Sequence, residues 1–212
     1  MADRLPFTAL TITRAPPFFV TAAGSFGWNK YNGKRNINIG STIKRTTNAD
    51  YSGRQYGAYI GGGYDIKGYS SATLTPLVSL QYSHLNLDSY TETGADALNL
   101  SVKKQGYDTL QSGLGVRTEY PIEFKNFTLT SEVHGKWLYD FFGDEVTMTS
   151  TFTGGGASFE AKGYKPAQSS FDVGTKLLLA HKQDLSLTAE YDVEVKEDFV
   201  GQHGAVTVRY NF

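Results

Sequence analysis

The stretch "LSLTAEYDVEVK", Leu185 to Lys196, alternates without a break between apolar and polar side chains. Its apolar set is Leu185, Leu187, Ala189, Tyr191, Val193 and Val195. A period of two places one set on each face of an extended chain, whereas an amphipathic helix repeats every three to four residues. The stretch therefore predicts a β-strand with one apolar and one polar face.

The same alternation recurs in seven further segments of the chain. They are residues 18–28, 56–66, 74–82, 110–120, 127–141, 171–180 and 204–212. Together the segments predict an all-β protein with eight strands in antiparallel up-and-down order. Residues 1–17 are expected to be a separate N-terminal segment, and residues 18–212 the β domain.

The bulk composition restricts the class of protein further. The chain has 212 residues, a net charge of −1, no Cys and a mean hydropathy of −0.34. A near-neutral charge gives no basic footprint for nucleic acid. The sequence contains no run of 18 apolar residues, so it predicts no transmembrane helix. Its start, "MADRLPFTALTITRAPPFF", does not resemble a signal peptide. A soluble β protein and a membrane β-barrel, whose alternation hides its hydrophobicity, remain open.

The connections between the predicted strands alternate in length. Long polar connections are expected at 32–53, 87–106 and 143–168, and tight turns at 67–71, 121–126 and 181–184. Outer-membrane barrels sort their connections in this way, with short turns on the periplasmic side. An even number of strands then places both termini in the periplasm.

Aromatic side chains gather at the ends of the predicted strands. They are Trp28, Tyr31, Tyr64, Tyr82, Tyr120, Trp137, Tyr139, Tyr210 and Phe212. Tyr and Trp favour the membrane–water interface, where one part of the ring is apolar and the other wet. The aromatic pattern therefore favours the transmembrane β-barrel.

The polar faces of the strands carry charges of both signs, which we call the charge ladder. Its members are Arg117, Glu119, Glu132, Lys136, Asp172, Lys176, Glu190, Asp192, Glu194 and Arg209. A barrel of eight strands is just wide enough for side chains to fill its interior. Opposite charges are then expected to pair inside, because a buried unpaired ion is costly.

Other candidate sites have a structural explanation that we favour. Glu190, Asp192 and Glu194 share a strand face and are suited to acid–base chemistry, but a ladder with basic partners is the preferred interpretation. The residues His84, His134, His181 and His203 lack metal-ligand spacing. We expect no catalytic, metal or cofactor site.

Two loops and one glycine run were also weighed. The glycines of "GGGYD", residues 61–65, are expected to permit close approach of a bulky group such as Tyr59, rather than to bind phosphate. The loop acids Asp88, Glu92 and Asp96 do not match an EF-hand. The residues Lys30, Lys34, Arg35, Lys44, Arg45 and Arg54 form a basic patch, either merely solvated or in contact with anionic lipopolysaccharide.

Several stretches, in this order, carry a family resemblance. They include "VTAAGSFGWNKY", "YSGRQYGAYIGGGYDIKG", "LTPLVSLQYSHLNLDSYTETG" and "GQHGAVTVRYNF". From about Phe18 to Phe212 the chain resembles the C-terminal translocator (β-domain) of classical monomeric autotransporters, the proteins of type V secretion. The family barrel has twelve strands around a pore helix, so the chain is expected to hold only its last eight.

The resemblance implies a non-enzymatic outer-membrane barrel of a Gram-negative bacterium, which anchors a polypeptide and exports an upstream passenger. The barrel-assembly machinery is expected to read the C-terminal strand through Val206, Val208, Tyr210 and Phe212. Outer-membrane lipid and lipopolysaccharide are the expected surroundings. A free-standing small barrel, acting as an adhesin or structural protein through its long loops, is the alternative. A soluble barrel with an internal ligand is a weaker third.

Overall fold

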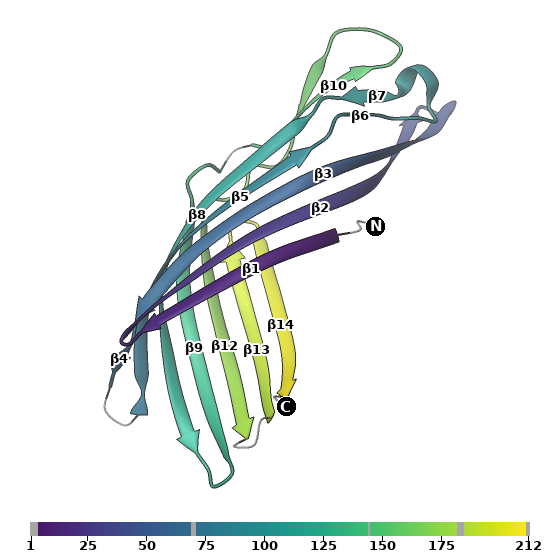
Figure 1. Cartoon of the computed structure of the whole chain (residues 1–212). Coiled ribbons are helices and arrows are strands. Elements are labelled where there is room, and N and C mark those ends of the chain that lie inside the picture. Colours follow the sequence, from purple (N-terminus) through teal and green to yellow (C-terminus); the bar gives the residue numbers. More distant parts are fainter. Residues whose placement is uncertain (1–3, 69–70, 144, 182–184, 211–212) are drawn as a thin grey trace.

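The computed structural model describes residues 4–68, 71–143, 145–181 and 185–210, with no side-chain description before Pro16. A ten-stranded antiparallel main sheet dominates the fold (Figure 1). Its strands, in spatial order, are β1 (Arg4–Ala15), β2 (Phe18–Ile39), β3 (Ile43–Tyr64), β5 (Thr73–Leu87), β8 (Gln105–Glu123), β9 (Phe127–Asp140), β12 (Ser169–His181), β13 (Leu185–Lys196) and β14 (Phe199–Tyr210), and the two-residue β4 (Ile66–Lys67) pairs with β5. Consecutive long strands are neighbours, so the predicted up-and-down order is confirmed.

A second, four-stranded sheet stands at one end of the main sheet (Figure 1). Its strands are β6 (Tyr90–Thr91), β7 (Leu100–Val102), β10 (Thr147–Phe152) and β11 (Phe159–Lys162), and the 3₁₀ helix η2 (Asp96–Leu98) precedes β7. The bridge between Asn48 and Thr93 joins this sheet to β3. We call residues 31–51, 88–104 and 145–164 the lobe.

The predicted number of eight strands is wrong, because the main sheet contains nine long strands. The additional strand is β1, which pairs with β2 from Arg4 opposite Asn29 to Ala15 opposite Phe18. Leu5 and Phe7 stand at odd positions but Leu10 and Ile12 at even ones, so no single alternation marks the strand. Most of the segment set apart as 1–17 is therefore continuous with the sheet.

The long connection expected at 32–53 is also wrong. β2 and β3 continue through it as paired strands, and only residues 40–42 turn between them. Both faces of this hairpin are largely polar, so the sequence lacks the alternation that marks a half-apolar strand. Backbone pairing, which does not depend on side chains, extends the strands.

Strand pairing also corrects the expected closure. A closed barrel of the eight predicted strands would pair residues 204–212 with residues 18–28, but β2 lies between β1 and β3, and β14 pairs with β13. The main sheet curls, and among the described residues no ladder joins β1 to β14 (Figure 1). Because the long strands are odd in number, β1 begins toward the lobe, whereas β14 ends beside Leu185 at the opposite end. The two described ends therefore do not share one side of the sheet.

The outer face of the main sheet exposes large apolar side chains. It includes Phe18, Val20, Trp28, Tyr56, Ile60, Tyr64, Val78, Leu80, Tyr82, Leu114, Val116, Tyr120, Val133, Trp137, Phe171, Val173, Leu177, Val195, Val206, Val208 and Tyr210. We call the part of the sheet that carries this face (18–28, 56–64, 74–82, 110–122, 127–141, 171–181, 185–195 and 199–210) the wall. An apolar face of this extent suits lipid, because lipid replaces water as its solvent.

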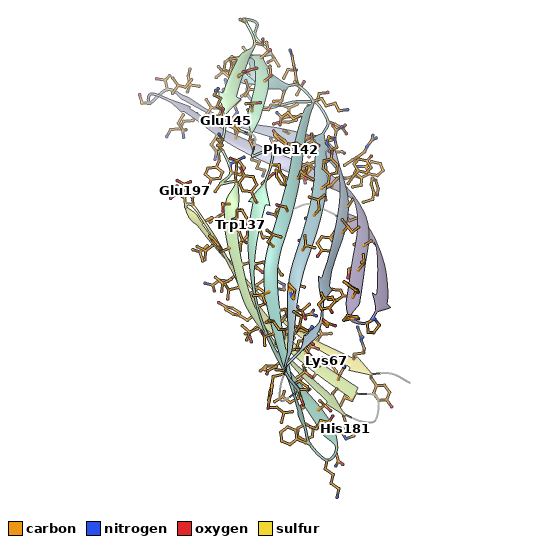
Figure 2. The ribbon with its side chains drawn as sticks, turned by 90° about the vertical axis from the view of Figure 1, so that its left-hand side faces the viewer. Lys67, Trp137, Phe142, Glu145, His181 and Glu197 are labelled. Carbon is orange, nitrogen blue, oxygen red and sulfur yellow. The ribbon has the colours of Figure 1, made fainter. Side chains whose placement is uncertain are left out.

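The ends of the wall differ, as the alternation of connections predicts. Phe142, Glu145 and Glu197 lie at the end that faces the lobe, and Lys67 and His181 at the other (Figure 2). The long connections 88–104 and 141–168 both leave from the lobe end. No helix in the described part of the chain is long and apolar enough to cross a membrane.

Candidate functional site on the inner face of the wall

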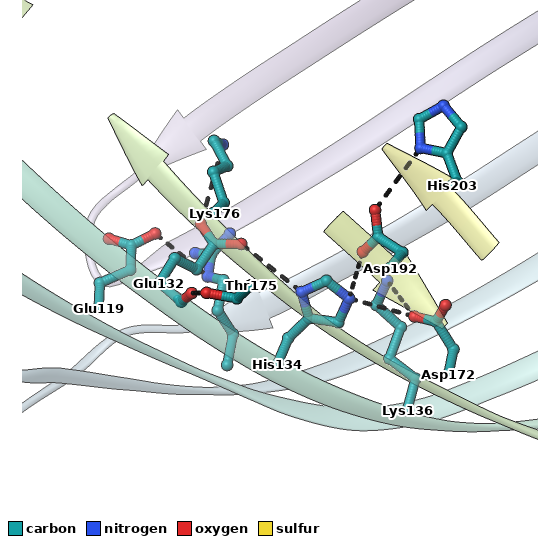
Figure 3. A network of polar contacts seen from close by, with 10 residues as sticks. Glu119, Glu132, His134, Lys136, Asp172, Thr175, Lys176, Asp192 and His203 are labelled. Carbon is teal, nitrogen blue, oxygen red and sulfur yellow. Dashed lines mark hydrogen bonds and ion pairs between the residues drawn. The ribbon is translucent and has the colours of Figure 1, made fainter. Parts of the chain in front are cut away.

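The inner face carries a network of polar side chains that strand register brings together (Figure 3). One row crosses five strands and consists of Arg117, His134, Gly174, Asp192 and His203. Successive side chains of a strand point to opposite faces, and directly paired residues share a face. The row therefore places a base, two imidazoles and a carboxylate side by side.

His134 is the centre of this network. Its Nε2 atom lies 3.1 Å from Asp172 Oδ1 and 3.3 Å from Asp192 Oδ1, and its Nδ1 atom lies 3.8 Å from Glu132. The His134 side chain is only 11% exposed. Lys136 Nζ donates to the same Asp172 oxygen at 3.3 Å. Three carboxylates from three strands therefore surround one imidazole.

Arg117 binds the acids next to this row. Its guanidinium lies 3.2 Å from Glu119 and 3.7 Å from Asp65, and it stands 5.2 Å above the ring of Phe19. Thr75 in turn donates to Asp65 at 2.8 Å. Asp65 was expected within the predicted strand 56–66 but was not counted in the charge ladder, and in the structure it follows the end of β3.

The charge ladder is thus formed in part. Seven of its members take part in ion pairs: Arg117, Glu119, Glu132, Lys136, Asp172, Lys176 and Asp192. Within the described residues, Glu190, Glu194 and Arg209 have no oppositely charged atom within 4.0 Å. Glu190 and Arg209 nevertheless line, with Lys176, one inner-face cavity of about 650 Å³.

The structure confirms the expectation for the glycine run. A Cβ at Gly61 would lie 2.8 Å from Cζ of Tyr59, and still closer to its hydroxyl, so the glycine makes room for this ring. Gly61 and Tyr59 also line a cavity of about 240 Å³ that reaches Lys136 and Asp172.

The lobe holds a second polar centre, away from the wall. Arg35 binds Glu92 through two hydrogen bonds, Nε to Oε1 at 2.9 Å and Nη2 to Oε2 at 2.5 Å, and the Leu100 amide donates to Glu92 at 2.9 Å. Burial by itself raises the pKa of Glu92, but these hydrogen bonds outweigh burial and hold the pKa below its ordinary value. The pKa of Arg35 is raised, chiefly by its hydrogen bond to Glu92.

Among the described residues, two members of the basic patch form ion pairs in the lobe, and four do not. Arg35 binds Glu92, and Arg45 lies 3.7 Å from Asp96, so Glu92 and Asp96 each face a basic side chain. The four other members, Lys30, Lys34, Lys44 and Arg54, are exposed on β2 and β3. Tyr31, expected in an aromatic belt, instead stacks on Tyr51 inside the lobe at 5.1 Å.

The proposed assembly signal lies on the edge strand β14. Val206, Val208 and Tyr210 are 73%, 67% and 64% exposed on the outer face. Thr207 and Arg209 line the inner cavity with Lys176. Phe212 lies outside the described residues.

Sequence reasoning missed the central position of His134. One donor atom from each of His134, Asp172 and Asp192 lies within 4.8 Å of the others, an arrangement suited to a metal ion. The three residues are far apart in the sequence, so no local spacing marks them. The only sequence signal was their shared place on polar strand faces, which does not give the register.

Comparisons with known proteins agree with this architecture. A family model of the autotransporter β-domain matches residues 8–192. Outer membrane protein A of Rickettsia conorii is 30% identical over 198 residues, and outer membrane protein B of Rickettsia typhi is 21% identical over 200. Each match covers 92% of this chain but only 10% and 12% of the relative, so the chain spans about a tenth of the length of these curated relatives.

A solved structure has the same fold. The translocator domain of the autotransporter NalP from Neisseria meningitidis superposes with a TM-score of 0.71 at 18% identity. The match covers 100% of this chain and 68% of that one. The curled sheet has the fold of most of such a translocator barrel, and the chain belongs to the autotransporter β-domain family of outer-membrane proteins.

Proposed function

We propose that this chain anchors a longer polypeptide in the outer membrane and supports export of a passenger to the cell surface. The observation that carries the proposal is the contrast between the two faces of the wall. Its outer face is apolar and exposed, whereas its inner face holds ion pairs around His134. A wall of this kind separates lipid from a polar interior through which a polypeptide can pass.

Further strands complete the barrel in this proposal. The backbone edges of β1 and β14 would be unsatisfied in lipid, which does not tolerate open sheet edges. In a twelve-strand barrel of the family, further strands would pair with both edges, and the nine long strands of this chain would form most of the barrel. Such a barrel also supplies a wider interior than the eight strands expected from the sequence, because barrel diameter grows with strand number.

We place the lobe outside the cell and the short turns in the periplasm. This orientation follows the usual sorting of loops in outer-membrane barrels. The C-terminal end of β14 is then periplasmic, whereas β1 begins near the outer surface. The arrangement replaces the expectation that both termini are periplasmic.

The barrel-assembly machinery is the proposed partner of the C-terminal strand. Val206, Val208 and Tyr210 present an accessible apolar face for recognition. Replacing Phe212 with Gln is expected to lower the yield of heat-modifiable barrel in outer membranes. Phe199→Gln, at the other end of β14, is the matched control, and equal yields of the two variants would contradict the role of Phe212.

We propose that lipopolysaccharide contacts those members of the basic patch that form no ion pair among the described residues. Lys30 and Lys34 share the outer face of β2 with Trp28, and Arg54 is the direct partner of Trp28 on β3. Positive charge beside an interfacial aromatic residue suits the phosphates of lipopolysaccharide. We propose no enzymatic role, because most acids of the charge ladder form ion pairs with neighbouring basic side chains or His134.

Epitope insertion tests export and orientation together. The chain is expressed behind a signal peptide with one epitope before Arg4 and a second between Gly155 and Gly156, which are exposed in the lobe. Intact cells are then treated with protease. Cleavage of both epitopes supports the proposal. Cleavage of the lobe epitope alone would place the start of β1 in the periplasm and contradict the proposed topology, and cleavage of neither would contradict the orientation.

A further inference from the structure

Three side chains of the wall converge on one point of its inner face (Figure 3). His134 Nε2 faces Asp172 Oδ1 at 3.1 Å and Asp192 Oδ1 at 3.3 Å, and the three donor atoms lie within 4.8 Å of one another. A tetrahedral ion with bonds of ~2.0–2.2 Å to nitrogen and oxygen holds neighbouring donors roughly 3.3–3.5 Å apart. The two distances from His134 are therefore already near the spacing that such an ion requires.

Gly174 makes this convergence possible. It pairs directly with His134 on one side and with Asp192 on the other. A Cβ at this position would lie 2.5 Å from His134 Cε1 and 2.8 Å from His134 Nε2, and it would also collide with the Asp192 carboxylate. The two flanking side chains meet across the glycine, in the space that any other residue would fill.

The charge ladder around this point has an excess of negative charge. Its ten members comprise six carboxylates and four basic side chains, so acids outnumber lysines and arginines by two. A divalent cation would offset this excess of negative charge. The charge balance and the glycine are separate observations that lead to the same ligand.

We infer that His134, Asp172 and Asp192 bind a divalent transition-metal ion of the Zn²⁺ class. Neutral imidazole suits zinc and its neighbours in the periodic table, whereas Ca²⁺ and Mg²⁺ take oxygen donors almost exclusively. A bound ion would join β9, β12 and β13 through their side chains. The inference does not depend on passenger export and is tested separately.

Two neighbours modulate the site. His203 Nδ1 lies 3.7 Å from Asp192 Oδ2 and, at 67% exposure, is free to turn toward the ion as a fourth ligand. Lys136 Nζ lies 3.3 Å from the Asp172 oxygen that faces His134, so its positive charge competes with the metal.

Zinc titration of the complete barrel that contains this chain, untagged, folded in detergent and followed by calorimetry, tests the inference. We expect one Zn²⁺ per chain, undisturbed by excess Ca²⁺. His134→Gln is expected to weaken zinc binding more than about ten-fold. His84→Gln is the matched control, because His84 faces a single carboxylate, Asp108, at 2.8 Å. The zinc affinity of this variant should equal that of the parent chain.

Two further variants keep the test independent of folding defects. Gly174→Ala keeps all three ligand residues but pushes His134 and Asp192 apart, so it should weaken binding as His134→Gln does. Lys136→Met removes the competing charge and should strengthen binding several-fold. Heat-modifiability confirms that each variant is folded. Absence of zinc binding by the parent chain, equal binding by His134→Gln, or no gain in Lys136→Met would overturn the assignment.

Discussion

The wall and the lobe are both built from antiparallel strands, but they differ in whether their apolar side chains are exposed or buried. The wall exposes its large apolar side chains, such as Val206 at 73%, and keeps polar ones inside. The lobe buries small apolar residues instead, with Ala95 and Val102 each 2% exposed. The difference follows from the solvent, because lipid surrounds the wall and water the lobe. The apolar area that a region buries therefore does not by itself measure how much that region contributes to the stability of this protein.

The wall and the lobe also differ in the arrangement of their ion pairs. In the wall, charges form a network that spans several strands around His134. In the lobe, the two-fold hydrogen-bonded pair of Arg35 and Glu92 holds the β2–β3 hairpin to the segment that follows β6. The wall distributes its electrostatic contacts over several strands, whereas the least exposed ion pair of the lobe joins Arg35 and Glu92.

The largest expected effect comes from a charge on the outer face of the wall. Val133, midway along β9 and 57% exposed, should face the lipid core. Val133→Arg is expected to destabilise the folded barrel by about 2–4 kcal/mol, because an ion there is moved into hydrocarbon. Urea unfolding in lipid vesicles measures the loss. Val146→Arg, at a position in the lobe that is 38% exposed, is the control and should change stability by less than about 0.5 kcal/mol.

The second effect concerns the pair in the lobe. Glu92→Gln removes the charged acceptor of Arg35 and of the Leu100 amide. We expect a local loss of about 1–2 kcal/mol, reduced by solvent because Arg35 is 37% exposed. Hydrogen exchange at Leu100 and at the Asn48–Thr93 bridge measures it. Exposed Glu160→Gln should leave these amides protected, and equal exchange in both variants would contradict the role of Glu92.

A smaller, graded effect is expected from acid. The pKa of Glu92 is lower in the folded lobe than its ordinary value of about 4.3. Its contribution is therefore complete above that ordinary value and is lost as the pH falls through the depressed pKa. The free energy of local opening in the lobe, obtained from amide exchange corrected for the intrinsic rate at each pH, should fall below about pH 4. The same fall in Glu92→Gln would show that another group is responsible.

The smallest effect should come from the aromatic stack of the lobe. Tyr51 lies between Tyr31 and Tyr90, with ring centroids 5.1 and 4.3 Å away. Tyr51→Leu keeps most of the apolar area but removes both stacking contacts, at a cost of about 0.5–1.5 kcal/mol. Thermal melting of the lobe, followed by tyrosine fluorescence, measures the change. A shift no larger than that of Tyr164→Leu, at an exposed lobe position, would contradict a contribution from stacking.

The sequence by itself determined the two-faced strands, their order and the family. Strict alternation from Leu185 to Val195 reports which residues face lipid, because the period of a strand is fixed by backbone geometry. The polar faces likewise predicted which charges lie inside. Where the alternation failed, in β1 and in the polar hairpin of β2 and β3, sequence reasoning failed with it.

Only the tertiary structure decided which of these residues meet. Register places His134 beside Gly174 and Asp192, and a shift of one residue would turn each strand's inner side chains outward. The lobe is also a tertiary product, since β7 and β10 come from separate connections. Backbone hydrogen bonds between distant segments fix these contacts, and no local pattern encodes them.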